Sequence, residues 1–364
     1  MKSLSRRWRS WTDELKRVRQ SLQGGPGYDG PRSDHFDGER FFNPGAEAGK
    51  SWLDVLRWWS TRRRKPWPRW RDRRAAPQLP TTLGEREGAL TLINHMTFLI
   101  QLPELTLLTD PVYSERPGPV RFAGPRRAHA PGVPFDQLPP VDLVLVSHNH
   151  YDHLDIPTLR RLARRFAPVF VTGLGNAAFL REQGIAQVIE LDWWQQTLLH
   201  GVRVSFTPAQ HWSDRGWSSR NRTLWGGMWL QTAAHQIYFS GDSGYSPLFD
   251  QLRTRLGTPD VALMPIGCYE PRWFMCAQHM NPDDAVRAHL DLRSRLSVGC
   301  HHGCFRLTDE GIDDPVVDLT AALQKHGVSA EQFRAPLPGE TLRFGVGARA
   351  AAEQTQPEAH CTSA

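Results

Sequence analysis

The chain has 364 residues, of which 40% are hydrophobic and 23% charged, as is typical of a globular protein with one large domain or two small ones. No apolar run approaches the roughly 20 residues that span a bilayer, so any membrane contact is expected to be peripheral. The N-terminal stretch lacks the apolar core of a signal peptide, and the five cysteines form no CxxC pair. We therefore expect a cytoplasmic protein, either free or held at the inner face of the membrane.

Residues 1–80 are predicted to form a basic N-terminal extension rich in Trp and Arg. Residues 1–77 hold 19 Lys and Arg against 9 Asp and Glu, whereas the rest of the chain holds 25 against 29. The stretch RWWSTRRRKPWPRWRDRR, residues 57–74, interleaves tryptophan with basic residues, which suits an anionic membrane surface. Nucleic acid is a less favoured partner, although aromatic and basic residues can also bind a single strand. The alternative is a solvated arm whose tryptophans pack on the rest of the chain.

Short apolar strands alternate with turns and helical patterns from about residue 81 to residue 345, which predicts an α/β sandwich. The tail 346–364 has no core pattern and is expected to be disordered. Helices are predicted at 11–22, 51–60, 156–166, 246–256 and 281–292, and strands at 202–208, 227–232, 236–242, 261–267 and 296–301, besides those in the stretch 88–111.

Histidines and aspartates gather in VLVSHNHYDHLD, residues 144–155, directly after an apolar run. In extended backbone His148 and His150 point to the same side, and a turn can bring Asp152 and His153 toward the same point. Imidazole nitrogens and carboxylate oxygens are ligands of Zn²⁺ and related ions. The cluster therefore predicts a metal site, whereas one isolated histidine here would indicate only a polar turn.

Three further candidate ligands follow apolar runs: His211 in VSFTPAQH, Asp242 in IYFSGD and His301 in LSVGCH. Each alone would fit an interior histidine or a turn former. Strand ends, however, hold side chains rigidly at one edge of a sheet, as a preorganised metal site requires. Together with the first cluster they supply seven N and O ligands, too many for one tetrahedral zinc ion and suited to a pair of ions.

Motifs along most of the chain resemble those of metallo-β-lactamase-fold hydrolases, and within them the branch of N-acyl-phosphatidylethanolamine phospholipase D and its bacterial relatives. The ligand cluster SHNHYDHLD carries the resemblance to the superfamily. The flanking stretches DHFDGERFFNP, LTDPVYSERPGPVRFAGPRR, PAQHWSDRG, SGDSGY and HHGCFRLTDE carry the resemblance to the branch. The implied fold is an αββα sandwich of two mixed sheets, formed by residues 81–345, with the metals at one edge between the sheets.

The resemblance also implies a complete set of ligands for two divalent cations, for which Zn²⁺ is the expected metal. Asp152 is expected to serve both as a ligand and in catalysis. By position, the ligands are His148, His150 and His211 for one ion, Asp152, His153 and His301 for the other, and Asp242 as the bridge.

Two stretches depart from the pattern of the branch. His301-His302-Gly303-Cys304-Phe305 stands where relatives usually have His-Trp-Gly-Thr-Phe, and His301 is favoured over His302 as the ligand. Asn94-His95 stands where relatives tend to have Gly-His, which leaves the role of His95 open. His279 lies where relatives place a histidine by the active site, and it is a candidate for orienting the substrate or assisting the leaving group.

The expected reaction is metal-assisted hydrolysis of a lipid phosphodiester such as N-acyl phosphatidylethanolamine, releasing phosphatidic acid and an N-acylethanolamine. A lactone or β-lactam hydrolase would use the same site on a carbonyl, because one fold serves many substrates. A peripheral membrane or nucleic-acid binding protein that uses the sandwich only as a scaffold is disfavoured by the complete ligand set. The sequence leaves open whether the chain forms a homodimer.

Overall fold

Continuous apolar runs form the parallel strands of two seven-stranded sheets, because such strands are buried on both faces. The computed structural model describes residues 25–45, 50–120, 122–216 and 218–345. The predicted helix at 11–22 and the predicted disordered tail at 346–364 lie outside them.

The first sheet has the strand order β14-β1-β2-β3-β4-β5-β6. Its pairs are antiparallel from β14 to β3 and parallel from β3 to β6. The strands are β1 (Glu87–Asn94), β2 (Thr97–Gln101), β3 (Thr106–Thr109), β4 (Leu143–Val146), β5 (Val169–Gly173), β6 (Val188–Leu191) and β14 (Thr341–Gly345).

The second sheet has the order β13-β12-β11-β10-β9-β8-β7. Its pairs are antiparallel from β7 to β10 and parallel from β10 to β13. The strands are β7 (Gln196–Leu199), β8 (Val202–Thr207), β9 (Gly227–Gln231), β10 (Gln236–Phe239), β11 (Val261–Pro265), β12 (Leu296–Cys300) and β13 (Phe333–Arg334).

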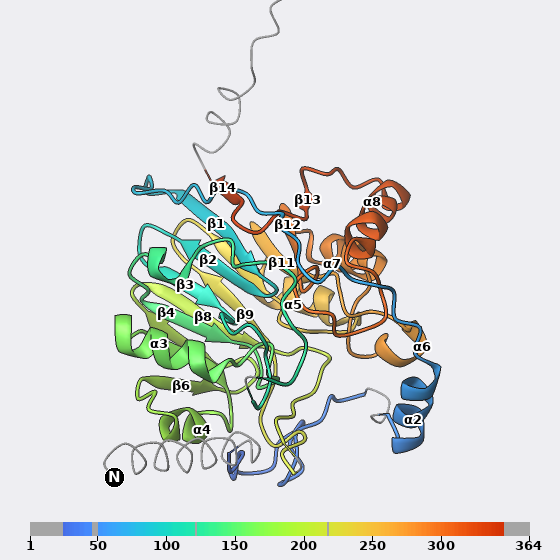
Figure 1. The fold of residues 1–364 in the computed structure, drawn as a ribbon. Coiled ribbons are helices and arrows are strands. Elements are labelled where there is room, and N and C mark those ends of the chain that lie inside the picture. The colour runs from blue at the N-terminus through green and yellow to red at the C-terminus, as the bar shows by residue number, and fades with distance from the viewer. Residues whose placement is uncertain (1–24, 46–49, 121, 217, 346–364) are drawn as a thin grey trace, which may run out of the picture.

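Helices cover the outer face of each sheet (Figure 1). A core of side chains from both sheets lies between them, including Leu145 of β4 and Phe206 of β8. The predicted αββα sandwich is therefore confirmed. On the first sheet lie α3 (Ile156–Phe166) and α4 (Ala177–Glu182), and on the second α5 (Leu248–Leu256), α7 (Pro282–Leu292) and α8 (Asp314–His326), while η1 (Phe135–Gln137), α2 (Trp52–Thr61) and α6 (Arg272–Met275) are short peripheral helices.

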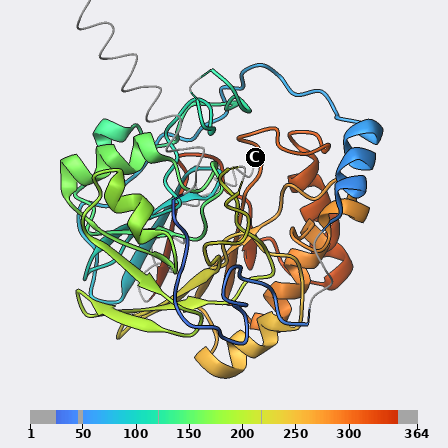
Figure 2. The ribbon, with the colours of Figure 1, turned by 90° about the horizontal axis from the view of Figure 1, so that it is seen from below.

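The N-terminal extension packs on the sandwich on both sides of α2. Phe36 and Phe41 are fully buried and belong to the core between the sheets. After α2 the chain continues as an extended segment, in which the backbone N–H groups of Lys65 and Arg71 donate to the carbonyls of Asp309 and Ala128. Figure 2 shows these blue segments passing over the molecule. None of the described helices has the length and apolar character needed to cross a bilayer.

Candidate metal centre

The ligand-rich loops meet because the strands before them end at the same edge of the sandwich. The loop after β4 carries the His148–His153 cluster, and the segments after β8, β10 and β12 carry His211, Asp242 and His301. Gly241 allows the segment after β10 to approach the loop after β4 closely, since a Cβ there would lie 2.7 Å from the carbonyl oxygen of Gly226 and 2.8 Å from Cβ of Ser147. Its φ of 61° also favours glycine.

A first ligand group consists of His148, His150 and His211, the three histidines predicted to share one ion. Nδ1 of His150 lies 2.8 Å from Nε2 of His148 and 3.3 Å from Nε2 of His211. Burial lowers the pKa of all three, to about 4 for His150 and well below the ordinary value for the other two. Neutral imidazoles offer a lone pair to a cation, so this group suits a metal ion.

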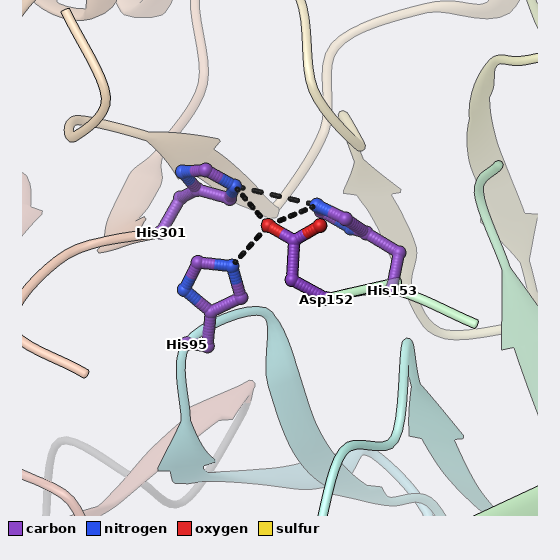
Figure 3. A group of neighbouring side chains, drawn as sticks. All are labelled: His95, Asp152, His153 and His301. Atoms are coloured by element: carbon purple, nitrogen blue, oxygen red, sulfur yellow. Dashed lines mark hydrogen bonds and ion pairs between the residues drawn. The ribbon is translucent and has the colours of Figure 1, made fainter. Parts of the chain in front are cut away.

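A second ligand group consists of Asp152, His153 and His301, and Figure 3 shows their side chains pointing toward one another. Oδ2 of Asp152 lies 3.6 Å from Nε2 of His153 and 3.7 Å from Nε2 of His301. His95, whose role the sequence left open, joins them with its Nε2 3.2 Å from Oδ2 of Asp152. Burial lowers the pKa of His95 to about 3. The second group thus has a fourth candidate ligand.

Asp242 lies between the two groups. Its Oδ2 is 3.2 Å from Nε2 of both His153 and His301 in the second group. The same oxygen is 3.7 Å from Nε2 of His211 and 4.0 Å from Nε2 of His148 in the first group. One carboxylate oxygen therefore reaches nitrogens of both groups, which is the position expected of a bridging ligand.

The charges and orphaned atoms of the cluster fit divalent cations. Burial opposes a charge on His153 and His301, but Asp242 and Asp152 raise the pKa of both well above the ordinary value. Their Nε2 atoms nevertheless face each other at 3.3 Å, where two protonated rings would repel. Oδ1 of Asp242 and Nε2 of His150 are buried without a hydrogen-bond partner in the described structure. Cations among these atoms would satisfy them and replace the protons.

A shell of hydrogen bonds orients the ligands. Its main member, Asp110, was not among the residues predicted from the sequence. Oδ2 of Asp110 accepts from Nδ1 of His153 at 2.7 Å and from the hydroxyl of Ser147 at 2.6 Å. The Ser147 hydroxyl also lies 2.9 Å from Nδ1 of His148. The available signal was the aspartate that ends a buried strand in LTDP. Metal-binding histidines commonly use their second nitrogen in this way.

The remaining residues singled out in the sequence lie at different distances from the cluster. His279 is near it, with Nδ1 3.9 Å from Oδ2 of Asp242, and burial lowers its pKa to about 4. His302 belongs to none of the candidate ligand groups found among the described residues, unlike its neighbour His301. Cys304 is buried in a small apolar cluster with Val112 and Phe305.

Residues 106–302 match the family model of the Beta-lactamase superfamily domain. The chain belongs to the β-lactamase superfamily. An uncharacterized protein of Mycobacterium tuberculosis is 40% identical over 259 residues, which make up 70% of the present chain and 68% of the mycobacterial protein. N-acyl-phosphatidylethanolamine-hydrolyzing phospholipase D 1 of Caenorhabditis elegans is 37% identical over 226 residues, 59% of this chain and 64% of that enzyme. The resemblance expected from the motifs is confirmed.

A solved structure has the same fold. The isothiocyanate hydrolase from Delia radicum gut bacteria superimposes with a TM-score of 0.57 at 21% identity and covers 71% of this chain and 99% of its own. The superfamily match, the curated relatives and the candidate ligand groups together identify the chain as a metal-dependent hydrolase of the β-lactamase fold.

Proposed function

We propose that the chain is a phosphodiesterase with two divalent metal ions, most simply Zn²⁺, that hydrolyses a lipid such as N-acyl phosphatidylethanolamine. The observation that carries this proposal is the position of Oδ2 of Asp242, within 4.0 Å of histidine nitrogens from both ligand groups. The phospholipase relative in Caenorhabditis elegans supports the choice of a lipid phosphodiester as the substrate.

In this proposal each part of the centre has a separate task. Two divalent ions held by the ligand groups would supply Lewis acidity and an activated water near neutral pH. Asp152 and Asp242 balance their charge, and the hydrogen bonds of Asp110 and Ser147 fix the orientation of His153 and His148. His279 stands beside Asp242, where its ring could donate a hydrogen bond to a phosphoryl oxygen of the substrate.

We further propose that the region 57–74 and α2 hold the enzyme on an anionic lipid surface. Helix α2 contributes an apolar face, because Trp52 is 70% exposed and Trp59 is 72% exposed. Tryptophan side chains of this kind settle at the headgroup level of a bilayer. The helix is anchored by Trp58, whose ring stacks on Phe274 of α6 with centroids 4.9 Å apart. Figure 1 shows α2 beside α6.

The anchoring helix α6 connects this surface with the metal centre. Arg272, the first residue of α6, donates to the carbonyl oxygen of His279 at 2.9 Å. The backbone N–H of His279 in turn donates to the carbonyl of Met275, at the end of α6. A lipid surface that binds α2 would therefore lie near the loop that carries His279.

Some basic side chains of the 57–74 region are engaged by the hydrolase domain itself. Nε of Arg62 lies 3.2 Å from Oδ1 of Asp309, and its Nη2 donates to the Leu307 carbonyl at 3.1 Å. Nζ of Lys65 lies 2.6 Å from Asp314. These contacts attach the segment to the domain, so tests of lipid binding should use side chains other than Arg62.

The deciding experiment measures metal content and substrate preference on the same preparation. Elemental analysis should find two metal ions per chain, and the variant His148→Ala with His150→Ala should lose metal. The metal-loaded chain should then hydrolyse N-acyl phosphatidylethanolamine and a soluble phosphodiester faster than a homoserine lactone or a β-lactam. A metal content near zero, or one unchanged in the double variant, would remove the basis of the proposal. Turnover confined to the lactone or the β-lactam would replace it with carbonyl hydrolysis.

A further inference from the structure

A cavity of about 380 Å³ lies where the N-terminal extension meets two loops of the hydrolase domain. Its lining is strongly basic, because it includes five arginines. One tryptophan also lines it. The extension supplies Arg64, Trp67 and Arg69, the loop after β3 supplies Arg116 and Arg126, and the segment after the ligand His301 supplies Arg306.

Few carboxylates balance these arginines. Arg126 pairs with Glu115. Arg64 comes no closer than 4.0 Å to Asp309, and that carboxylate is already paired with Arg62. Among the described residues, no carboxylate lies within 4.0 Å of the side-chain nitrogens of the other three arginines of the cavity, Arg69, Arg116 and Arg306.

Two details of these arginines are consistent with a site for an anion. Nε of Arg306 is buried and has no hydrogen-bond partner in the described structure, although a buried donor of this kind is costly to leave unpaired. Partial burial, followed by repulsion from Arg62 and Arg306, lowers the pKa of Arg64. An anion in the cavity would reduce the repulsion between these cations.

Hydrogen bonds hold the walls of the cavity in place. The indole N–H of Trp67 donates to the carbonyl of Glu310 at 2.9 Å, beside the backbone contact of Lys65 with Asp309. Ala128 also lines the cavity, and its backbone N–H donates to the carbonyl of Cys304 at 2.8 Å. The arginines therefore project from a fixed frame, which lowers the entropic cost of binding a ligand.

We propose that this cavity binds a phosphate group of an anionic ligand, at a site separate from the metal centre. Guanidinium groups match phosphate oxygens with paired N–H donors, and several of them around one cavity neutralise a phosphate that carries two charges. Trp67 gives the same cavity an apolar wall for the part of the ligand that carries the phosphate. Neither the metal ligands nor the proposed hydrolysis requires this site, so it can fail while the proposed function stands.

The site connects with the metal centre through one shared segment. Phe305, the neighbour of Arg306, places its ring in an edge contact with His95, with centroids 5.2 Å apart. His95 in turn contacts Asp152. The phosphate could belong to a lipid headgroup at the membrane surface or to a soluble phosphate compound, and the experiment separates these sources.

The test compares two double variants of the full-length, metal-loaded chain. Arg64→Gln with Arg69→Gln removes two cavity charges from exposed positions, and neither side chain donates a hydrogen bond within the described structure. Arg164→Gln with Arg203→Gln, at exposed positions on α3 and β8, is the control with the same change in net charge. Metal content and thermal unfolding establish that both variants are folded.

Calorimetric titration with inorganic phosphate should show binding that is about tenfold or more weaker in the cavity variant than in the control variant. Because both variants retain the metal centre, phosphate that binds there contributes equally to the two titrations.

Sedimentation with phosphatidylcholine vesicles, with and without phosphatidic acid, then identifies the source of the phosphate group. Loss of phosphatidic-acid-dependent binding in the cavity variant assigns a lipid headgroup, and unchanged vesicle binding assigns a soluble phosphate. Equal affinity of the two variants for inorganic phosphate would overturn the proposal.

Discussion

Nδ1 of His153 lies 2.7 Å from Oδ2 of Asp110, and neither side chain is accessible to solvent. A carboxylate can only accept, so Asp110 holds the proton on Nδ1 and leaves Nε2 facing Asp242 and His301. We expect Asp110→Asn to weaken metal binding or activity by about 10- to 100-fold, because the amide lacks the charge and has one acceptor oxygen, whereas both oxygens of Asp110 accept hydrogen bonds here. Competition with a chelating dye measures the metal affinity.

Asp142→Asn is the matched control for this prediction. Asp142 caps the backbone N–H of Thr106 at 2.8 Å, at the opposite end of β3 and β4 from the metal centre. The control should therefore keep its metal affinity even if its folding stability falls. Equal metal affinity in the Asp110 variant and the control would show that Asp110 only supports the fold.

Asp242→Asn should be the most damaging single change to a ligand. Its Oδ2 approaches nitrogens of both groups, and the amide would lose the charge that holds two cations together. We expect turnover to fall to no more than a few per cent of the wild-type kcat, with the fold retained. Steady-state kinetics measures turnover, elemental analysis measures the metal content, and circular dichroism measures whether the fold is retained. Higher residual activity would contradict the bridging role.

The parts of the site that could be predicted from the sequence are those determined by local order along the chain. His148, His150, Asp152 and His153 lie within six residues, so the turn after β4 alone brings them together. The metal-binding character of this cluster follows from residue type and spacing. The sandwich was predictable for the same reason, because each apolar run and amphipathic helix bears its own pattern.

The parts that could not be predicted depend on contacts between distant segments. Asp110 precedes its partner His153 by 43 residues, and its one signal in the sequence, an aspartate at the end of a buried strand, is equally typical of a turn former. His95 joins the second group only because the β1–β2 turn lies against His301, whose backbone N–H donates to the His95 carbonyl. The arginine cavity combines three segments, and in the sequence its basic residues look like a solvated arm.

His279→Ala should reduce kcat on a phosphodiester with an alkyl leaving group and on one with a nitrophenyl leaving group by a similar factor. Burial lowers the pKa of His279 to about 4, and nearby cations would lower it further, so the ring is neutral near pH 7 and can orient substrate through its N–H. His279→Gln, which retains a donor, should recover part of the loss. A loss much larger for the alkyl ester would instead identify His279 as the proton donor to the leaving group.

His35 should make the docking of the N-terminal extension sensitive to pH. Burial opposes its charge, but hydrogen bonds to Asp192 and Asp34 outweigh burial and raise its pKa above the ordinary value. This stabilisation is complete below the unfolded pKa of about 6.5 and disappears as pH rises through the folded pKa.

The difference in Tm between the wild-type chain and His35→Gln should therefore be largest below about pH 6.5 and shrink as the pH rises. Differential scanning fluorimetry across this range measures it. His200→Gln, on the exposed turn between β7 and β8, is the control and should show no such trend. A difference in Tm that is constant with pH would show that His35 contributes by packing on Trp193 rather than by its charge.

Trp52→Ser with Trp59→Ser should weaken binding to anionic vesicles by about tenfold or more, because each change removes a large apolar surface that could enter the headgroup region. Both rings project from α2 into solvent, whereas Trp58 between them anchors the helix on Phe274 and is left in place.

The control, Leu290→Ser with Val317→Ser, removes exposed apolar side chains from α7 and α8. Vesicle sedimentation measures binding, and turnover of a soluble phosphodiester should be unchanged in both variants. If the α2 variant lost both activities equally, the helix would act by supporting the loop of His279. If both variants bound vesicles as the wild-type chain does, α2 would not be the docking surface.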